Sequence, residues 1–452
     1  MNILYITVDA LRADHVTPSL MPATSEFINQ GVEYVRCYAN GPGTPWSFPA
    51  LLGGRYSAST EGFGIPCAND PRPTLAEVLQ KKGYVTAGFT DNRFASSEYN
   101  YDRGMDSMFD AGATSSDKQL KQIVRERLDH DGILYQSLLK GYHLTDDIIV
   151  NLRGRETRFV RAESLISQLK QWIQDQSTEW FAWLHPMDTH APYEAPDTYQ
   201  VQYLDEPISR RHSQKIAQKA VHHPEDLNES EWKMQQRLYK SECAYLDDKL
   251  GDLFTYICQK VDDNTLIIFT ADHGEMHGEH GLGGHPQRFW EEVIHVPCAI
   301  SAPDNKDAKI TDQISLVDLP PTILALAGID TPTEWVGKNI YPSANVVNPE
   351  REFVFIDVGA ELNRNLVAVR RADNWKLLRH HEDGELLLDL DSNPIEDPSK
   401  DKQENESDVY QSLTNAVDAH LDAMDKDRNK KREAVEDEEM IEEHLKELGY
   451  LE

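Results

Sequence analysis

The residues with the clearest chemical potential follow an apolar run in the second half of the chain. Residues 265–269 read Thr-Leu-Ile-Ile-Phe, a pattern typical of a buried parallel strand, and Asp272 and His273 come just after it. Open α/β folds build their sites at the carboxyl ends of such strands. Carboxylate and imidazole together suit a divalent cation, so this pair predicts a metal site at a sheet edge. A polar loop whose histidines only face solvent is the alternative interpretation.

Polar residues at other strand ends extend this pattern. Asp9 closes the strand pattern at the N-terminus, and Asp188 and His190 follow the strand pattern of residues 180–185. A single histidine is more often structural than functional, but several such residues at strand ends of one α/β chain favour a common site. The glycine-rich loop after the central pair contributes two further histidines, His280 and His285.

Two hydroxyl side chains could supply a nucleophile. Residues 40–55 form a Gly/Pro-rich loop that opens into an apolar helix pattern, and Thr44 and Ser47 stand near its start. The free backbone N–H groups of a helix start favour an anion, whereas a simple helix cap is the alternative role. Asn92, in the loop after the strand pattern of residues 85–90, could contact a substrate, although turn chemistry explains it equally well.

Alternating strand and helix patterns would position these residues. Strands are expected at residues 3–9, 85–90, 180–185 and 265–270, and helices at residues 73–83, 162–175 and 229–259. Such alternation implies a parallel sheet with helices on both faces. The expected fold class is therefore α/β, with a doubly wound, mostly parallel sheet in a catalytic domain of residues 1–345.

The pattern changes after about residue 345. Short apolar segments joined by polar turns predict a small antiparallel sheet, at residues 352–356, 366–369, 375–378 and 385–388. A helix is expected at residues 409–425, and the highly charged residues 425–446 keep one apolar face that could dock on the protein. Residues 346–452 are therefore expected to form a smaller α+β C-terminal subdomain.

Composition limits the class of protein. Hydrophobic residues make up 39% of the 452 positions, enough for the core of a globular protein. No apolar run approaches the roughly 18 residues of a membrane span, so no transmembrane segment is expected. The chain starts directly with a strand pattern rather than the basic start of a signal peptide, which predicts a cytoplasmic location. The 5 scattered cysteines argue against a disulfide framework and a zinc knuckle.

The charge balance is strongly acidic. The chain has 77 Asp and Glu residues against 45 Lys and Arg residues, a net charge of −32. Such a surface repels nucleic acid and anionic membranes, so neither is an expected partner. Because the acidic excess is spread along the chain, a halophilic protein in a salt-rich cytoplasm is favoured over an ordinary acidic protein with an acidic tail. No pattern indicates an oligomeric state.

The order of these motifs resembles the sulfatases, a family of the alkaline-phosphatase superfamily. The resemblance spans nearly the whole chain and rests on residues 2–12, 44–55, 99–106, 188–193, 278–282, 315–322, 375–377, 385–390 and 445–452. It implies an alkaline-phosphatase-like fold in which one divalent metal lies beside a nucleophile at a helix start.

The nucleophile segment departs from the family's pattern. Sulfatases convert a Cys or Ser in a Cys/Ser-x-Pro-Ser-Arg segment to formylglycine, but Thr44 stands at that position and Phe48 replaces the Arg. Because Thr cannot become formylglycine by that route, no formylglycine is expected. Other departures are Ala10 for a second Asp, His273 for an Asn, and Asp91 and His285 for two sulfate-contacting lysines.

What remains resembles the Thr-nucleophile branches of the superfamily, which include phosphodiesterases and phospho-group transferases. The resemblance implies that Asp9, Thr44, Asp272 and His273 hold one divalent metal, which lowers the pKa of the Thr44 hydroxyl. The imidazole of His273 favours Mn²⁺ or Zn²⁺, with Ca²⁺ and Mg²⁺ as alternatives, because the latter two prefer oxygen ligands.

The remaining candidate residues would contact the substrate. His190, with His285 as a further candidate, would bind the anion or protonate the leaving oxygen. Asp188 is expected to orient His190 rather than to act directly. The other expected contacts come from His280, Asn92 and Ser47, of which Ser47 is also the second choice of nucleophile.

The expected function is that of a metal-dependent hydrolase that cleaves a sulfate or phosphate ester through attack by Thr44. A phosphate ester is favoured because the sulfatase-specific Cys, Arg and Lys positions are lost. The anionic ester could belong to a small molecule, a glycan or a lipid headgroup. Two alternatives stay open: a transferase that passes the phospho group to an alcohol of a glycan or lipid, and a catalytically inactive binding protein.

Overall fold

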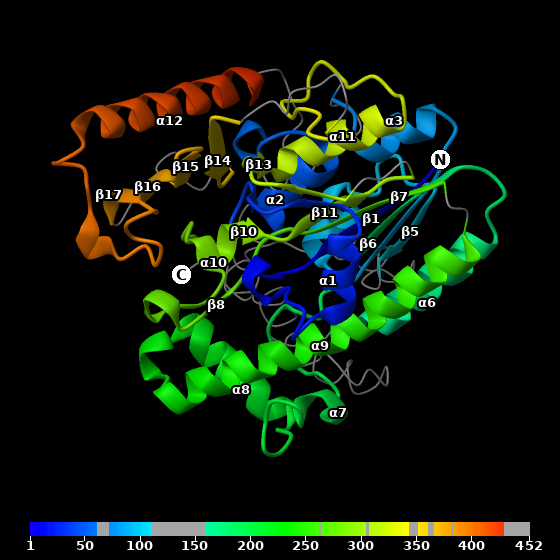
Figure 1. Ribbon diagram of the computed structural model, residues 1–452, viewed down its shortest axis with the longest axis horizontal. Coiled ribbons are helices and arrows are strands. Elements are labelled where there is room, and N and C mark those ends of the chain that lie inside the picture. The colour runs from blue at the N-terminus through cyan, green and yellow to red at the C-terminus, as the bar shows by residue number, and fades with distance from the viewer. Residues whose placement is uncertain are drawn as a thin grey trace, which may run out of the picture.

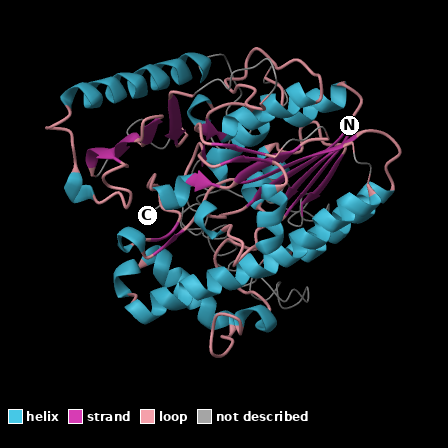
Figure 2. Cartoon of the chain, viewed as in Figure 1, coloured by secondary structure: helices cyan, strands magenta, loops and turns pink. Residues whose placement is uncertain are grey.

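A large central sheet organises the molecule, and helices lie on two sides of it (Figures 1 and 2). The computed structural model describes residues 1–60, 72–110, 159–261, 264–303, 307–342, 351–359, 366–380 and 383–428. The main sheet has the strand order β12-β2-β11-β7-β1-β6-β4-β5. The charged segment that was expected to dock beyond residue 428 lies outside the described residues.

Parallel strands form the half of the sheet that carries the site. At its centre β1 (Asn2–Val8) pairs in parallel with β7 (Thr265–Ala271) on one side and β6 (Trp180–His185) on the other. Beyond β6 come β4 (Val85–Thr90) and β5 (Ser107–Asp110), also parallel. Continuous apolar runs suit these strands because helices bury both faces of the sheet. The carboxyl ends of β7, β1 and β6 therefore lie side by side.

In the opposite half of the sheet, one of the described strands runs antiparallel to its neighbours. β11 (Cys298–Ser301) runs antiparallel to β7 and to β2 (Val32–Tyr34), and β12 (Ala308–Ile310) is parallel to β2. The sheet is thus mostly parallel, which confirms the expected fold class. Two small sheets, β10-β3-β13 and β8-β9, lie in this part of the chain. Their strands are β3 (Cys37–Tyr38), β8 (Met276–His277), β9 (Gly283–Gly284), β10 (His295–Val296) and β13 (Ile314–Ser315).

Helices cover both faces of the main sheet, as in a doubly wound fold (Figure 1). One face carries α1 (Pro22–Asn29), α6 (Ala162–Gln174) and α9 (Glu229–Lys260). The other face carries α2 (Thr44–Gly53), α3 (Leu75–Lys81) and α11 (Leu319–Leu326). Shorter or more peripheral helices are α7 (Asp197–Gln200), α8 (Arg210–His222) and α10 (Glu291–Ile294). None of the described helices, α9 included, combines the length and apolar character that spanning a bilayer requires.

Local sequence signals set several helix ends. Thr74 and Glu77 form a capping box at the start of α3, where each side chain bonds the other residue's backbone N–H. Asn228 and Glu231 do the same for α9. At the end of α2, Gly54 adopts a φ of 60°, the left-handed conformation in which glycine lacks the steric cost of a Cβ. Short-range interactions therefore fix where α2 ends and where α3 and α9 begin.

The C-terminal part forms a four-stranded antiparallel sheet covered by one long helix. Its strands are β14 (Phe353–Asp357), β15 (Val367–Arg371), β16 (Trp375–His380) and β17 (Gly384–Asp389), in that order. The helix α12 (Ser407–Arg428), orange to red in Figure 1, runs along this sheet. These elements agree with the small antiparallel sheet and the helix expected after residue 345.

The two faces of this sheet pack against different partners. On one face, Leu413 and Val417 of α12 form an apolar cluster with Val367, Val369, Leu377 and Leu387. On the other face, buried residues that include Val354, Ile356 and Leu378 join the central core of the molecule. The C-terminal sheet is therefore held between α12 and the main body. The expected boundary near residue 345 stays a prediction, because residues 343–350 lie outside the described chain.

Candidate metal and ester site

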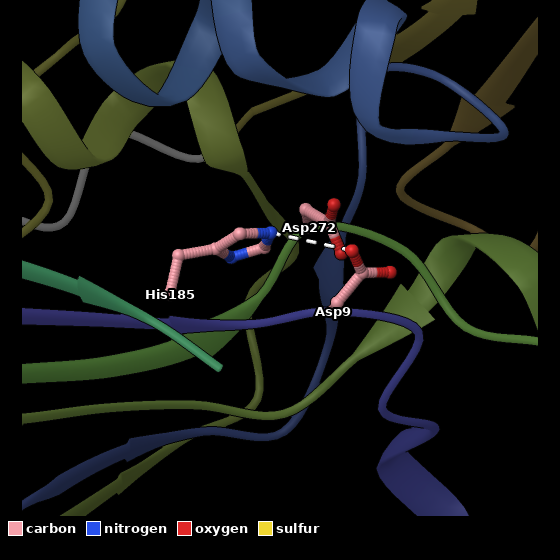
Figure 3. Close-up of side chains that lie close together, drawn as sticks. All are labelled: Asp9, His185 and Asp272. Carbon is pink, nitrogen blue, oxygen red and sulfur yellow. Dashed lines mark ion pairs between the residues drawn. The ribbon is translucent and has the colours of Figure 1, made fainter. Parts of the chain in front are cut away.

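Three polar side chains meet where β1, β6 and β7 end (Figure 3). Asp9, His185 and Asp272 are each 0% exposed, and one ligand atom from each lies within 4.8 Å of the others. Parallel pairing explains the meeting, because Ile6 of β1 lies opposite both a β6 and a β7 residue near their carboxyl ends. With the neighbouring His273, these residues are called the Asp9 cluster below.

Among the described residues, one oxygen of the Asp9 carboxylate has a hydrogen-bond partner and the other has none. Asn92 donates its amide N–H to Asp9 Oδ2 at 2.6 Å. Asp9 Oδ1 is buried and has no hydrogen-bond partner among the described residues, and His273 Nε2 lies 3.6 Å from it. A buried carboxylate oxygen without a partner is costly unless a cation or a proton compensates it. The environment of Asp9 therefore fits a bound cation.

The imidazole of His273 is oriented as a metal ligand would be. Its Nδ1 donates to the backbone carbonyl of Gly274 at 2.8 Å, so Nε2 of the neutral ring carries the lone pair. That nitrogen lies 3.6 Å from both Asp9 Oδ1 and Asp272 Oδ2. Histidine ligands commonly donate their other N–H to a carbonyl in this way. Two carboxylates and an imidazole thus fit a divalent cation.

Thr44 lies beside Asp272, at the first residue of α2. Its hydroxyl donates to Asp272 Oδ2 at 2.8 Å and accepts a hydrogen bond from the Asn92 amide at 3.1 Å. Asp272 Oδ1 accepts from the backbone N–H groups of Ala10 and His273 at 3.2 and 2.8 Å. The Thr44 hydroxyl is therefore held in a defined orientation among the residues of the cluster.

The two carboxyl groups of the cluster differ in acidity. Burial alone would raise the pKa of Asp9, but the neighbouring His190, His185 and His273 outweigh it and lower that pKa below its usual range. Burial raises the pKa of Asp272, and the charge of Asp9 adds to the rise. Asp272, the carboxylate that accepts from Thr44, is thus the more basic of the two.

His190 and His285 face each other next to the cluster. Their Nε2 atoms lie 3.1 Å apart, and His190 Nδ1 donates to the carbonyl of Ala191 at 2.6 Å. The His285 ring centroid is 4.6 Å from that of His273. Burial, together with the nearby His273 and His190, holds the pKa of His285 well below its usual value, so this ring stays neutral near pH 7. The structure therefore brings together two of the three histidines that were expected to contact the substrate.

Asp188 contacts Arg161 and the start of α6. Asp188 Oδ1 lies 3.0 Å from Arg161 Nε, and Oδ2 accepts from the backbone N–H of Ala162 at 2.9 Å. Burial raises the pKa of Asp188, and the charge of Arg161 opposes that rise. The ring of His190 is hydrogen-bonded to the Ala191 carbonyl, and the expectation that Asp188 orients this ring stays a prediction.

The structure does not bring Ser47 or His280 into contact with the cluster. Ser47 lies one turn inside α2, where its hydroxyl donates to the carbonyl of Gly41 at 3.0 Å. The ring of His280 stacks on Trp290 with centroids 4.2 Å apart, and its Nε2 is 4.0 Å from Glu292. Among the described contacts, both side chains serve local packing, whereas Asn92 does reach the cluster.

His185 was not predicted as a metal-site residue from the sequence, where it stands only at the last position of an expected strand. The signal available in the sequence was that His185 ends a strand, just as Asp272 follows the end of another strand. That signal gains meaning only when β6 is known to lie beside β1, which places His185 Nε2 3.3 Å from Asp9 Oδ2.

Comparisons with known sequences match most of the chain. The sulfatase family profile matches residues 1–329, and a profile described as N-sulphoglucosamine sulphohydrolase, C-terminal, matches residues 278–426. The choline-sulfatase of Rhizobium meliloti (strain 1021) is 32% identical over 189 residues, which are 41% of this chain and 36% of that protein. The chain thus aligns with about a third of the length of this curated relative.

Two solved structures share the architecture. The phosphonate monoester hydrolase of Agrobacterium radiobacter superposes with a TM-score of 0.68 at 18% identity, covering 93% of this chain and 96% of that chain. A protein in complex with its substrate D-glucosamine-2-N,6-O-disulfate superposes with a TM-score of 0.67 at 18% identity, covering 95% and 99%. At these identities the likeness is one of fold.

Proposed function

Because this chain belongs to the sulfatase family, we propose that it is a metal-dependent hydrolase that cleaves a sulfate or phosphate ester through attack by Thr44. One observation carries the proposal: the Thr44 hydroxyl donates to Asp272 at 2.8 Å, next to the unpartnered Oδ1 of Asp9. Metal-assisted ester cleavage needs a polarised hydroxyl beside carboxylates that can bind a cation.

The proposed metal-site residues are Asp9, Thr44, Asp272 and His273. A divalent cation held there would neutralise charge on the bound ester and lower the pKa of the hydroxyl. The nitrogen donor of His273 favours Mn²⁺ or Zn²⁺, whereas Ca²⁺ and Mg²⁺ prefer oxygen ligands. Formylglycine has no part in this proposal, since position 44 is a threonine.

Thr44 Oγ1 attacks the phosphorus or sulfur atom, and its proton passes along the existing hydrogen bond to Asp272 Oδ2. The Asn92 amide meanwhile donates to the attacking oxygen and holds its orientation. The new bond joins Thr44 Oγ1 to the central atom, and the bond to the leaving oxygen breaks with its electron pair.

His190, in its protonated form, is the proposed donor of a proton to the leaving oxygen. Its Nδ1 is fixed by the Ala191 carbonyl, which leaves Nε2 to face His285 and the substrate. His285, neutral through burial, would contact the ester's oxygens without adding a full positive charge. Attack of water on the Thr44 ester then completes hydrolysis, whereas attack of an alcohol would make the protein a transferase.

A phosphate ester is the preferred substrate within this proposal. Thr44, Phe48, Asp91 and His285 stand where sulfatases use formylglycine, arginine and two lysines. The names of the similar proteins include both kinds of ester chemistry: a sequence relative is a choline-sulfatase, and a structural neighbour is a phosphonate monoester hydrolase. The neighbour that binds a sulfated glucosamine supports an anionic ester on a sugar as one substrate class, beside small molecules and lipid headgroups.

The test is turnover of an aryl sulfate, an aryl phosphate monoester and an aryl phosphodiester by purified protein with Mn²⁺ or Zn²⁺. We expect cleavage of a phosphate ester to exceed that of the aryl sulfate. Product analysis with an added alcohol separates hydrolysis from transfer, because a transferase would form the alcohol's ester. Binding of inorganic phosphate without turnover of any ester would indicate the inactive binding protein instead.

The acidic surface bears on where the protein works. With 77 acidic and 45 basic residues, its self-repulsion is large in dilute buffer and screened in concentrated salt. We therefore propose a salt-rich cytoplasm as its setting. Thermal unfolding measured from dilute to molar KCl tests this, and a melting temperature that falls as KCl rises would contradict it.

A further inference from the structure

His185 offers a second imidazole to the Asp9 cluster, from the strand on the other side of β1. Its side chain is 0% exposed, and its Nε2 lies 3.3 Å from Asp9 Oδ2. That nitrogen has no hydrogen-bond partner among the described residues. Figure 3 shows the ring directed at the carboxylates of Asp9 and Asp272.

The other ring nitrogen of His185 determines what Nε2 can do. Nδ1 contacts the backbone carbonyl of Thr7, and a carbonyl only accepts, so Nδ1 carries a hydrogen. Trp183 Nε1 donates to the Thr7 hydroxyl at 2.9 Å, and this bond holds Thr7 beside the His185 ring. In the neutral form with its hydrogen on Nδ1, the ring points its Nε2 lone pair at the Asp9 carboxylate. Two such electron-rich atoms face each other favourably when a cation lies between them.

His185 and His273 approach Asp9 from β6 and β7, the strands on either side of β1. Each uses Nδ1 to bond a backbone carbonyl, that of Thr7 or that of Gly274. Each directs Nε2 to a different oxygen of Asp9, His185 to Oδ2 at 3.3 Å and His273 to Oδ1 at 3.6 Å. A carbonyl behind each ring is the arrangement that orients histidine ligands in metal sites.

We propose that His185 is a direct ligand of the divalent cation, so that the site binds its metal with two imidazoles and the carboxylates of Asp9 and Asp272. This inference rests on the proposed metal site and adds a donor to it from β6. A second nitrogen ligand strengthens selection for Zn²⁺ or Mn²⁺ over Ca²⁺, since Ca²⁺ takes oxygen ligands. If His185 only hydrogen-bonded to Asp9, it would leave the metal with one imidazole.

The experiment counts imidazoles at the metal, without reference to activity. Full-length protein is stripped with a chelator, reloaded with one equivalent of Zn²⁺ and examined by X-ray absorption spectroscopy. We expect two imidazole ligands in the unaltered protein, and one in His185→Ala and in His273→Asn. Zn²⁺ affinity, measured by competition with a chelating dye, should fall at least about tenfold in His185→Ala.

A matched control is available in His277. This histidine is 1% exposed, and neither ring nitrogen has a hydrogen-bond partner among the described residues. Its ring packs against those of Tyr239 and Tyr193, with centroids 4.4 and 5.8 Å away. His277→Ala removes a buried imidazole of equal size, so it should leave the Zn²⁺ affinity and the imidazole count unchanged.

His185→Gln separates a ligand from an orienting residue. The glutamine amide can hydrogen-bond to Asp9 but lacks the imidazole nitrogen, so we expect one imidazole and weakened binding, as in His185→Ala. A single imidazole in the unaltered protein, or an unchanged count in either variant, would overturn the inference and leave the proposed hydrolase intact. Absence of Zn²⁺ binding in the unaltered protein would overturn both. Should His185→Ala fail to fold, the count in the unaltered protein still decides.

Discussion

The hydroxyl of Thr44 donates a 2.8 Å hydrogen bond to Asp272, 228 positions further along the chain. The bond joins the first residue of α2 to the end of β7, and both side chains are fully buried. Asn92 binds the same hydroxyl from a third segment. Three separate parts of the chain thus hold one oxygen in place, as a nucleophile requires.

The first prediction concerns that oxygen. Thr44→Ala should lower kcat for the best ester substrate by at least about a thousandfold, because the covalent step is lost, and Thr44→Ser should retain part of it. Steady-state kinetics with Mn²⁺ measure this. Ser47→Ala is the control, since the Ser47 hydroxyl bonds the Gly41 carbonyl, and it should retain most of the activity. Full activity in Thr44→Ala would remove Thr44 as nucleophile.

The second prediction concerns the metal. Chelation should abolish activity, and Mn²⁺ or Zn²⁺ should restore it better than Ca²⁺, because His273 Nε2 faces Asp9 and Asp272 at 3.6 Å. His273→Asn replaces nitrogen with an amide oxygen and should shift the order towards Ca²⁺. Initial rates across a metal series give the comparison. Restoration of the unaltered protein by Ca²⁺ alone would contradict the assignment of His273.

The third prediction concerns Arg161, which bridges buried carboxylates near the His190 loop. Its guanidinium contacts Asp188 at 3.0 Å and Glu242 at 2.7 Å, and Glu242 in turn accepts from the backbone N–H of Glu194 at 2.5 Å. Arg161→Ala should lower the free energy of unfolding by about 3 kcal/mol, because two buried carboxyls lose their counter-charge. Urea unfolding measures the change. Arg161→Lys keeps the charge and should cost less; equal losses would mean that packing, not charge, dominates.

The fourth prediction is a pH dependence of stability. Burial raises the pKa of Glu275 to about 8, although the hydrogen bond from Tyr193 opposes the rise. Between the usual pKa of 4.5 and about 8 the folded state keeps a proton that the unfolded state has lost. Stability from this group therefore falls as pH rises through that range and is constant above it.

Glu275→Gln removes this titration. Relative to the unaltered protein, the variant should become steadily more stable from about pH 5 to about pH 9, in urea unfolding with a chelator present. Glu279→Gln is the control: burial would raise the pKa of Glu279, but Arg12 outweighs it and lowers that pKa. Its effect should therefore be constant between about pH 6 and about pH 9. A Glu275→Gln difference that does not vary with pH would contradict the prediction.

The fifth prediction tests how α12 is attached. Leu413 is 0% exposed and packs with Val417 against β15, β16 and β17. Leu413→Ala should cost about 2–5 kcal/mol of unfolding free energy, the range for deleting buried leucine atoms. Gln411→Ala, on the exposed side of α12, should be near neutral. Thermal unfolding compares the two, and similar melting temperatures would show that this face of α12 contributes little.

Much of the fold follows from local sequence patterns. Apolar runs and helix caps act over a few residues, so the strands at residues 3–9 and 265–270 and the long helix from residue 229 were predictable within a few positions. The short strands β2, β11 and β12 were not anticipated. Each has four residues or fewer, too few to carry a period, and their pairing partners lie far away in sequence.

Part of the site, too, was predictable from the sequence, and part was not. Asp9, Thr44, Asp272 and His273 stood out in the sequence because each begins or ends an element, and the structure brings them together. Asp188 and His280 also follow strands, yet they contact Arg161 and Trp290 instead. A strand end tells which edge of the sheet a residue reaches, but not which neighbour it meets there.

The sequence by itself determined the strand and helix segments, the family pattern and the kinds of side chain gathered at the sheet edge. Only the tertiary structure decided that β6 lies next to β1, and so that His185 faces Asp9 at 3.3 Å. The physical reason is that strand order depends on the packing of helices and on pairings between distant segments. Such interactions act through space and leave no periodic trace in the sequence around His185.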